Sequence, residues 1–321
     1  MRIERETVLQ LRLPYCENLH VGRTVFCGGE GPRVAVVSGI HGDEIEGLYL
    51  THRIAAWLEE LAATQPGALR GTVEIYPAVN PLGIDTMTRS VPPYGSDLNR
   101  QFPGHAGGLF PQRIAAAVVA AVQGAALVVD VHASNIYLRE IPQVRIATEF
   151  ADTLVPLART MNLDVIWVHG AMTVLEATLA HSVNERRTPC LVVEMGVGMR
   201  VTPAFTEQVL TGLLHTWRRL GVFDPRLELP PLSHAPLVAD DGNVQYLNAD
   251  TSGLFIPEIE HWTSVAAGQC LGRIVSPHHG RTLSEVRSPT EGVLFTLREF
   301  PLVHEGSLMA RIVAGGSGRV P

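Results

Sequence analysis

The chain has 321 residues, long for one domain and comfortable for two, and its 46% apolar against 18% charged residues supply a substantial core. A formal net charge of −7 gives no basic surface for nucleic acid, so no nucleic-acid partner is expected. All 25 basic residues are arginine, and the absence of lysine excludes Schiff-base chemistry, pyridoxal phosphate attachment, a phosphate-loop lysine and a biotinyl or lipoyl carrier.

Residues 1–30 are expected to form short strands joined by glycine-rich turns. From residue 33 to 222, apolar strand-like runs alternate with helical patterns, which is typical of βαβ units. This predicts an α/β fold with a mostly parallel or mixed sheet flanked by helices. The expected strands are residues 34–40, 73–76, 125–131, 164–168 and 190–193, and the expected helices are residues 46–63, 111–123, 151–161 and 203–220. A long loop at residues 77–108 is rich in Gly, Pro, Asn and Asp, and such loops are usually functional.

The character of the sequence changes after Phe223. Four prolines predict a linker at residues 225–236. Residues 237–314 contain short, alternating, glycine-punctuated segments, which predict a C-terminal all-β barrel or sandwich domain. Residues 1–224 then form the α/β domain with an N-terminal β extension, and residues 315–321 a flexible tail.

Cysteine usage and apolar runs indicate the compartment. The N-terminus lacks the apolar stretch of a signal peptide. The longest apolar run, residues 114–129, is interrupted and shorter than the ~20 residues of a membrane helix. We therefore expect a cytoplasmic protein with no membrane partner and with four reduced thiols, Cys16, Cys27, Cys190 and Cys270.

Side chains that can bind a metal follow three of the apolar runs. His41 and Glu44 follow the first run, His132 the second and Glu194 the third. In an open α/β sheet the carboxyl ends of such strands meet at one edge, where sites are built. Two histidines and one glutamate form the ligand set of a catalytic zinc that keeps a position open for water. The sequence predicts one Zn²⁺ per chain on His41, Glu44 and His132, with Glu194 left as a proton carrier.

The motifs around these residues resemble the succinylglutamate desuccinylase/aspartoacylase family of zinc-dependent deacylases, which is allied to the zinc carboxypeptidases. The resemblance covers about residues 30–222. It implies a zinc carboxypeptidase-like fold and hydrolysis of the amide bond of a small N-acylated amino acid or amine. The matching segments are Gly39-Ile40-His41-Gly42-Asp43-Glu44, Asn80-Pro81, Asp97-Leu98-Asn99-Arg100, Phe102-Pro103-Gly104, Asp130-Val131-His132 and Val193-Glu194-Met195-Gly196.

Catalytic and carboxylate-binding roles are predicted for residues near the metal ligands. Glu194 is expected to take the water proton and return it to the leaving amine. Arg89 is expected to stabilise the negative charge that develops on the carbonyl oxygen of the substrate in the transition state. Asn99 and Arg100 offer an amide and a guanidinium fork, a good fit to a substrate carboxylate.

Less direct signals mark the surroundings of the site. Asp130 precedes His132 by two residues; we expect it not to reach that ring and to accept instead from His41. The segment after His132 is expected to form pocket wall. Three residues of this segment are candidates for contacting the acyl or amine part of the substrate: Tyr137, Arg139 and Arg145. Aspartoacylases of the human type carry an Arg about ten residues before the catalytic Glu; this chain has Asn184 there, followed by Arg186 and Arg187.

The C-terminal domain resembles a biotinyl/lipoyl-like β-fold through residues 268–272 and 288–292, but it has no carrier lysine. It is expected to cover the pocket mouth or to mediate contacts of a homo-oligomer.

The leading prediction for the function of the protein is a zinc-dependent deacylase acting on a small N-acylated substrate with a carboxylate. Two alternatives stay open: a metallocarboxypeptidase acting on short peptides, and a non-catalytic metal-binding or regulatory protein of the same fold.

Overall fold

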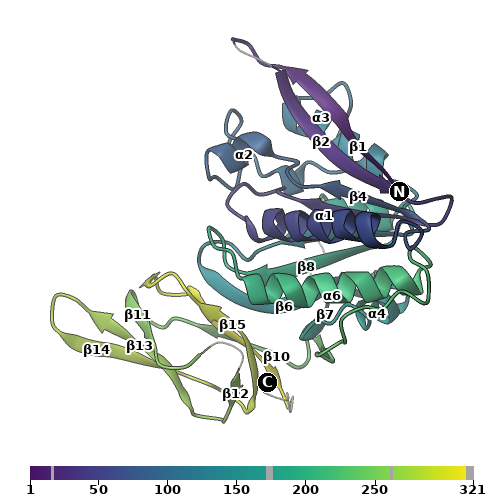
Figure 1. The fold of residues 1–321 in the computed structure, drawn as a ribbon. Coiled ribbons are helices and arrows are strands. Elements are labelled where there is room, and N and C mark those ends of the chain that lie inside the picture. Colours follow the sequence, from purple (N-terminus) through teal and green to yellow (C-terminus); the bar gives the residue numbers. More distant parts are fainter. Residues whose placement is uncertain (16–17, 171–175, 261–262, 316–321) are drawn as a thin grey trace.

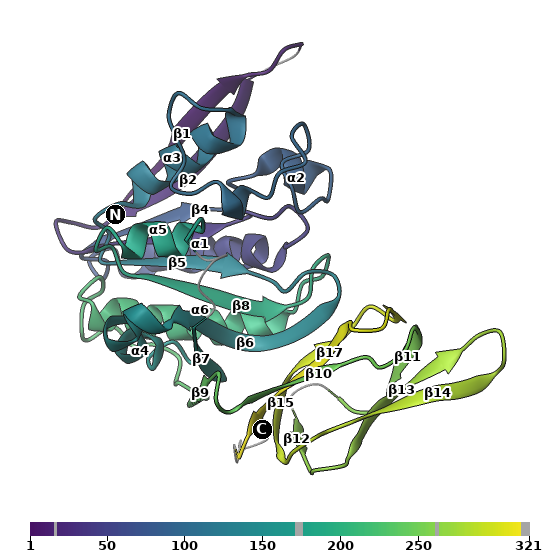
Figure 2. The same ribbon diagram turned by 180° about the vertical axis from the view of Figure 1, so that it is seen from behind.

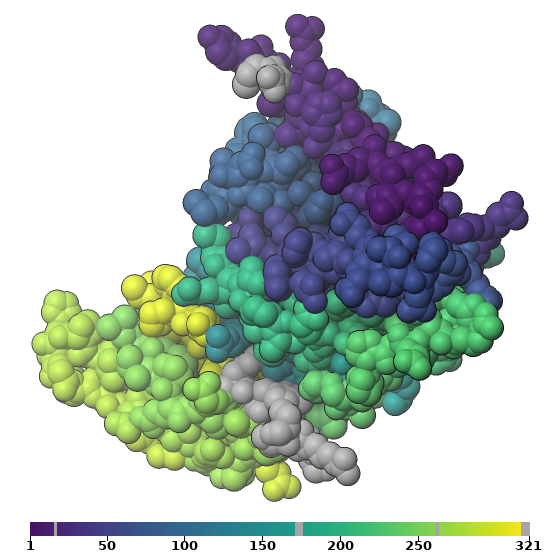
Figure 3. Space-filling view, viewed as in Figure 1, coloured from purple at the N-terminus to yellow at the C-terminus, as the bar shows by residue number. Residues whose placement is uncertain are grey.

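The computed structural model describes residues 1–15, 18–170, 176–260 and 263–315. The predicted free thiol of Cys16 and the predicted tail beyond residue 315 lie outside these ranges. An α/β part and a β-rich C-terminal part lie side by side (Figure 1), and the space-filling view shows the C-terminal part as a distinct mass on one side of the molecule (Figure 3). Among the described helices, none is long and apolar enough to cross a membrane.

Within the described residues, a 13-stranded sheet runs through both parts, with the main order β1-β2-β4-β3-β5-β8-β6-β15-β17-β10. Strand β7 pairs with β6, β9 with β7, and β12 with β15. The strands of this sheet are β1 (Arg2–Arg12), β2 (Asn18–Cys27), β3 (Arg33–Ser38), β4 (Thr72–Tyr76), β5 (Leu127–His132), β6 (Leu138–Ala147), β7 (Val165–His169), β8 (Cys190–Gly196), β9 (Leu237–Asp240), β10 (Val244–Asn248), β12 (Thr263–Val265), β15 (Gly292–Arg298) and β17 (Leu308–Ala314).

The centre of the sheet is parallel. Strand β3 pairs in parallel with β4 and β5, and β5 pairs in parallel with β8, with His132 opposite Glu194. These strands are apolar along almost their whole length because helices cover both faces. Because these strands are parallel, their carboxyl ends meet at one edge of the sheet, as the sequence predicts. The predicted fold class is confirmed.

Helices α1 (Glu46–Thr64) and α6 (Pro203–Arg219) cover one face of the sheet (Figure 1), and α3 (Phe110–Val122) and α5 (Leu179–Asn184) cover the other (Figure 2). Helix α1 shows why such segments pack this way: Leu50, Ile54, Leu58 and Leu61 recur at helical spacing and are buried. The remaining helices are α2 (Pro81–Asp85), α4 (Ala151–Ala158), and the 3₁₀ turns η1 (Leu98–Arg100) and η2 (Thr148–Phe150).

Strand β6 lies at the centre of the sheet, where the sequence predicts only pocket wall. It is antiparallel to β8 on one side and to β15 on the other. Its buried side chains include Glu140 and Gln143. Because Glu140, Gln143 and Arg145 interrupt its buried apolar residues, β6 lacks the regular apolar alternation by which a strand is recognised.

The C-terminal part continues the large sheet and adds a second sheet. Strand β15 pairs with β6, and β9 pairs in parallel with β7, so backbone hydrogen bonds cross the predicted linker boundary. The division into domains at residues 225–236 stays a prediction. The second sheet has the order β14-β13-β11-β16 and comprises β11 (Gly253–Pro257), β13 (Cys270–Ser276), β14 (Arg281–Arg287) and β16 (Leu302–Val303).

Candidate metal centre and active site

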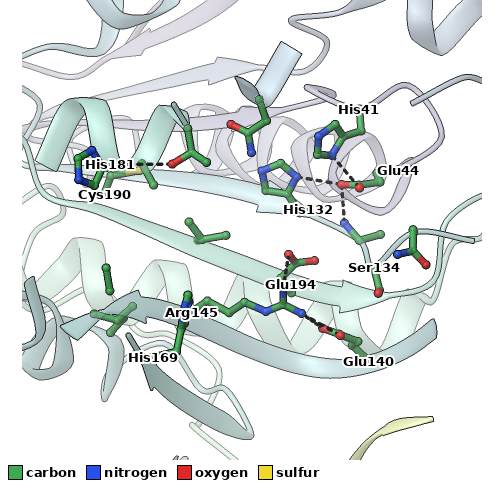
Figure 4. A pocket seen from close by; sticks show the side chains of 18 of the residues that line it. His41, Glu44, His132, Ser134, Glu140, Arg145, His169, His181, Cys190 and Glu194 are labelled. Carbon is green, nitrogen blue, oxygen red and sulfur yellow. Dashed lines mark hydrogen bonds and ion pairs between the residues drawn. The ribbon is translucent and has the colours of Figure 1, made fainter. Parts of the chain in front are cut away.

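A cavity of about 260 Å³ opens at the carboxyl ends of β5 and β8. Figure 4 shows His41, Glu44 and His132 grouped on one side of it, Glu194 and Arg145 below them, and His181 and Cys190 at its far end. The cavity thus joins the ends of the parallel strands to the space beneath α5. The site is described from the metal-binding group outward.

His41, Glu44 and His132 converge on one point. Glu44 Oε1 lies 2.7 Å from His41 Nδ1, and Glu44 Oε2 lies 2.9 Å from His132 Nδ1. One ligand atom from each side chain lies within 4.8 Å of the others, and all three residues are at most 4% exposed. The turn that presents His41 and Glu44 requires Gly42, because a Cβ there would lie 1.9 Å from the backbone of Gly83.

Each imidazole also meets a second carboxylate. Asp97 Oδ1 lies 3.0 Å from His41 Nε2, and Asp130 Oδ1 lies 3.2 Å from His132 Nε2. The prediction that Asp130 serves His41 is therefore wrong: residues i and i+2 share a strand face, and this ring turns back toward its own neighbour. Metal-ligating histidines characteristically direct their other ring nitrogen at a carboxylate or carbonyl.

This donor set fits a metal ion. Each imidazole directs Nδ1 at the centre of the group and Nε2 at an outer carboxylate, so the ring orientation suits ligation through Nδ1. Burial opposes ionisation of Glu44, but the two rings outweigh it and hold its pKa well below the usual range. Burial likewise opposes protonation of His132, but Asp130 and Glu44 raise its pKa. Because ligand imidazoles must be neutral, metal binding here must release protons.

Glu194 stands beside the metal-binding group, at the end of β8. Its Oε1 lies 3.3 Å from Arg145 Nη1, and its Oε2 is buried without a hydrogen-bond partner among the described residues. Burial, aided by the nearby Glu140 and Glu44, raises the pKa of Glu194 despite the opposing Arg145. A carboxyl group with these properties can both accept and return a proton.

Arg145 lines the cavity and pairs with carboxylates on two neighbouring strands. Its guanidinium lies 2.6 Å from Glu140, which is fully buried. Glu140 also accepts from Arg311, which comes from β17 in the C-terminal part, at 2.7 Å. Arg145 thus belongs to an ion-pair chain from Arg311 through Glu140 and Arg145 to Glu194, and its contact with a substrate stays a prediction.

The other predicted cations and amide line the opposite wall of the cavity. Arg89 donates to Glu44 at 3.0 Å and to Asp97 at 3.2 Å, so its guanidinium lies at the edge of the metal-binding group. Asn99 Oδ1 accepts from the backbone of Leu179 at 3.1 Å. Arg100 lines the cavity and donates to the carbonyl oxygen of Asn99.

Tyr137 and Arg139 are placed elsewhere, contrary to the prediction. The Tyr137 ring packs against Phe300 and under the Arg298 guanidinium, 5.0 Å away. Arg139 lies 3.8 Å from Glu299. Alternation along β6 explains the error for Arg139: Leu138 and Glu140 line the cavity, so the residue between them faces away.

Three side chains that contact the predicted site residues directly or through one another, Asp97, Glu140 and Arg311, have no predicted role. Asp97 lies in a quoted motif but carries no predicted role, and Glu140 lies in a segment read as wall. Arg311 is separated from Glu140 by 171 positions, and no local pattern marks it.

Comparison with known proteins identifies the family of this chain. Residues 30–220 match the model of the succinylglutamate desuccinylase/aspartoacylase catalytic domain. The N-alpha-acetyl-L-2,4-diaminobutyric acid deacetylase of Halomonas elongata is 28% identical over 308 residues, covering 90% of this chain and 84% of that protein.

Solved structures share the whole fold. The product-bound ectoine utilization protein EutE from Ruegeria pomeroyi has a TM-score of 0.80 at 22% identity and covers 97% of this chain and 95% of its own. The succinylglutamate desuccinylase/aspartoacylase from Rhodobacter sphaeroides also has a TM-score of 0.80, at 23% identity, with the same coverage. The family model spans more than half of the chain, so this protein belongs to the succinylglutamate desuccinylase/aspartoacylase family.

Proposed function

We propose that this protein is a zinc-dependent deacylase that hydrolyses the amide bond of a small N-acylated amino acid. The observation that carries the proposal is the group of His41, Glu44 and His132, with a carboxylate behind each ring. The relative from Halomonas elongata is a deacetylase of an N-acetylated amino acid, which supports the same class of reaction.

A zinc ion on His41, Glu44 and His132 would supply an acidified water and polarise the amide carbonyl. The chain's own groups then account for the proton transfers. Glu194 takes the water proton on its unpartnered Oε2 and returns it to the leaving nitrogen. Arg89, at the edge of the metal-binding group, is positioned to donate to the oxygen on which charge develops. Arg100 binds the substrate carboxylate.

Metal removal tests this function. Dialysis against a zinc chelator is expected to lower the rate of N-acyl amino acid hydrolysis by at least about 100-fold, because several kcal/mol of transition-state stabilisation are lost. Readdition of zinc should restore the rate in proportion to the metal bound, measured by atomic absorption. Full activity in metal-free protein would contradict the proposal.

The carboxylates behind the rings give a second prediction. Asp97→Asn is expected to weaken zinc binding about 10–100-fold, because His41 loses the charged acceptor that orients its ring. Competition with a chromophoric chelator measures the affinity. Asp85→Asn, at an exposed position at the end of α2, is the matched control and should bind zinc as the native chain does. Equal affinity of the Asp97 and Asp85 variants would show that Asp97 does not support the site.

A further inference from the structure

The cavity continues beyond the metal-binding group into a region that we call the apolar pouch. Its walls come from β6, η2, α4, α5 and β8, and Cys190 marks this end of the cavity in Figure 4. Leu154, Ile146 and Cys190 are at most 2% exposed. The pouch is lined by Ile146, Phe150, Leu154, Ala180, Cys190 and Val192.

Two polar side chains beside the pouch, Asn184 and His181, already have partners in the protein. Asn184 donates to the carbonyl of Cys190 at 3.0 Å and accepts from its backbone nitrogen at 2.8 Å, which uses both ends of the amide. His181 Nε2 lies 3.1 Å from Glu149, and its ring packs on Phe150. Burial also raises the pKa of the Cys190 thiol, which keeps it neutral. A charged group entering the pouch would lose its hydration, and the buried walls of Ile146, Leu154 and Cys190 offer it no opposite charge in return.

A substrate carboxylate, in contrast, would find a cation in the same cavity. Among the described guanidinium groups that line the cavity, those of Arg89, Arg145 and Arg311 each pair with a carboxylate, whereas Arg100 has none within 4 Å. Arg100 follows Asn99, and Asn99 is bonded to Leu179 at the start of α5. Helix α5 also supplies Ala180 to the pouch, and Ala180 and Arg100 line the same cavity.

Resting on the proposed function, we infer that the substrate is an N-acyl α-amino acid with an uncharged, apolar side chain. Its carboxylate pairs with Arg100, its amide faces the metal-binding group, and its side chain fills the apolar pouch. The relative from Halomonas elongata acts on a diaminobutyric acid derivative, whose side chain carries an amino group. This chain would therefore differ from that relative in the subsite for the substrate side chain, which here would accept an apolar group in place of one with an amino group.

A substrate matrix tests the inference on the zinc-loaded full chain. N-acetyl and N-succinyl derivatives of glycine, leucine, aspartate and 2,4-diaminobutyrate are compared by kcat/KM, together with N-hexanoylglycine. Leucine derivatives are expected to exceed glycine, aspartate and diaminobutyrate derivatives at least about tenfold, because each buried methylene contributes about 10-fold or more. Preference for a charged side chain, or for N-hexanoylglycine over N-acetylleucine, would overturn the inference while leaving deacylation intact. Failure to hydrolyse any member would overturn the proposed function itself.

Filling the pouch gives an independent readout. In Ala180→Leu, the ratio of kcat/KM for N-acetylleucine to that for N-acetylglycine should fall at least about tenfold, because the new side chain occupies the space of the substrate. Ala120→Leu, at an exposed position of α3, is the matched control and should keep the native ratio. An unchanged ratio in Ala180→Leu would count against the pouch. Calorimetric titration of Glu194→Gln protein with N-acetylleucine and N-acetylaspartate measures the same preference without turnover, and tighter binding of the aspartate derivative would overturn it.

Discussion

Glu194→Gln protein is expected to hydrolyse N-acyl amino acids about 10²–10⁴-fold more slowly than the native chain, because an amide cannot act as the general base. The same protein should keep its full zinc content. Glu194 lies opposite His132 across the β5–β8 pair and belongs to none of the pairs that hold the metal-binding group together. Loss of rate with retained metal therefore separates proton transfer from metal binding.

The partner of Glu194 explains why the change should act on the rate. Arg145 holds one carboxylate oxygen, and the other oxygen is buried without a partner, so a single atom is left to exchange a proton with the substrate. Glutamine at this position keeps the volume and the contact to Arg145 but cannot exchange that proton.

Steady-state kinetics and atomic absorption on the same preparation measure both quantities. Glu185→Gln, which changes an exposed carboxylate at the end of α5, is the control and should keep native rates. A Glu194→Gln protein with native kcat would exclude this residue as the base. A protein that has lost its zinc would instead make Glu194 a ligand.

The elements that the sequence predicts well are those whose burial is uniform. Strands β3, β5 and β8 are apolar because helices cover both of their faces, and α1 shows a regular stripe of leucine and isoleucine. Strand β6 could not be recognised, because it borders the cavity and carries Glu140 and Arg145 where apolar side chains would be expected. The polar side chains that this strand directs toward the cavity therefore prevent its recognition from the sequence pattern.

The candidate site divides in the same way. His41, Glu44, His132 and Glu194 could be selected because each follows a strand, and parallel strands bring their ends together. The direction of a ring and the far partner of an ion pair are set by tertiary packing. The contact of Asp130 with His132 and the reach of Arg311 from β17 therefore appear only in three dimensions.

Glu140→Gln is expected to lower the free energy of unfolding by about 3–5 kcal/mol, because two buried guanidinium groups lose the charge that balances them. Glu140 is fully buried and accepts from both Arg145 and Arg311, whose side chains are 23% and 14% exposed. Urea denaturation of zinc-saturated protein measures the shift of the unfolding midpoint. Glu207→Gln breaks an exposed pair with Arg53 and should change stability by no more than about 1 kcal/mol.

A second substitution distinguishes charge balance from simple loss of packing. If Glu140 matters because it neutralises Arg311, then Glu140→Gln combined with Arg311→Leu should be less destabilising than the sum of the two single changes, by about 0.5–3 kcal/mol. Strict additivity would mean that the two side chains do not interact energetically, despite their 2.7 Å contact. A coupling of the expected size would instead make the C-terminal part a structural component of the active site, because Arg311 would then help to hold the Glu140–Arg145 pair against which Glu194 rests.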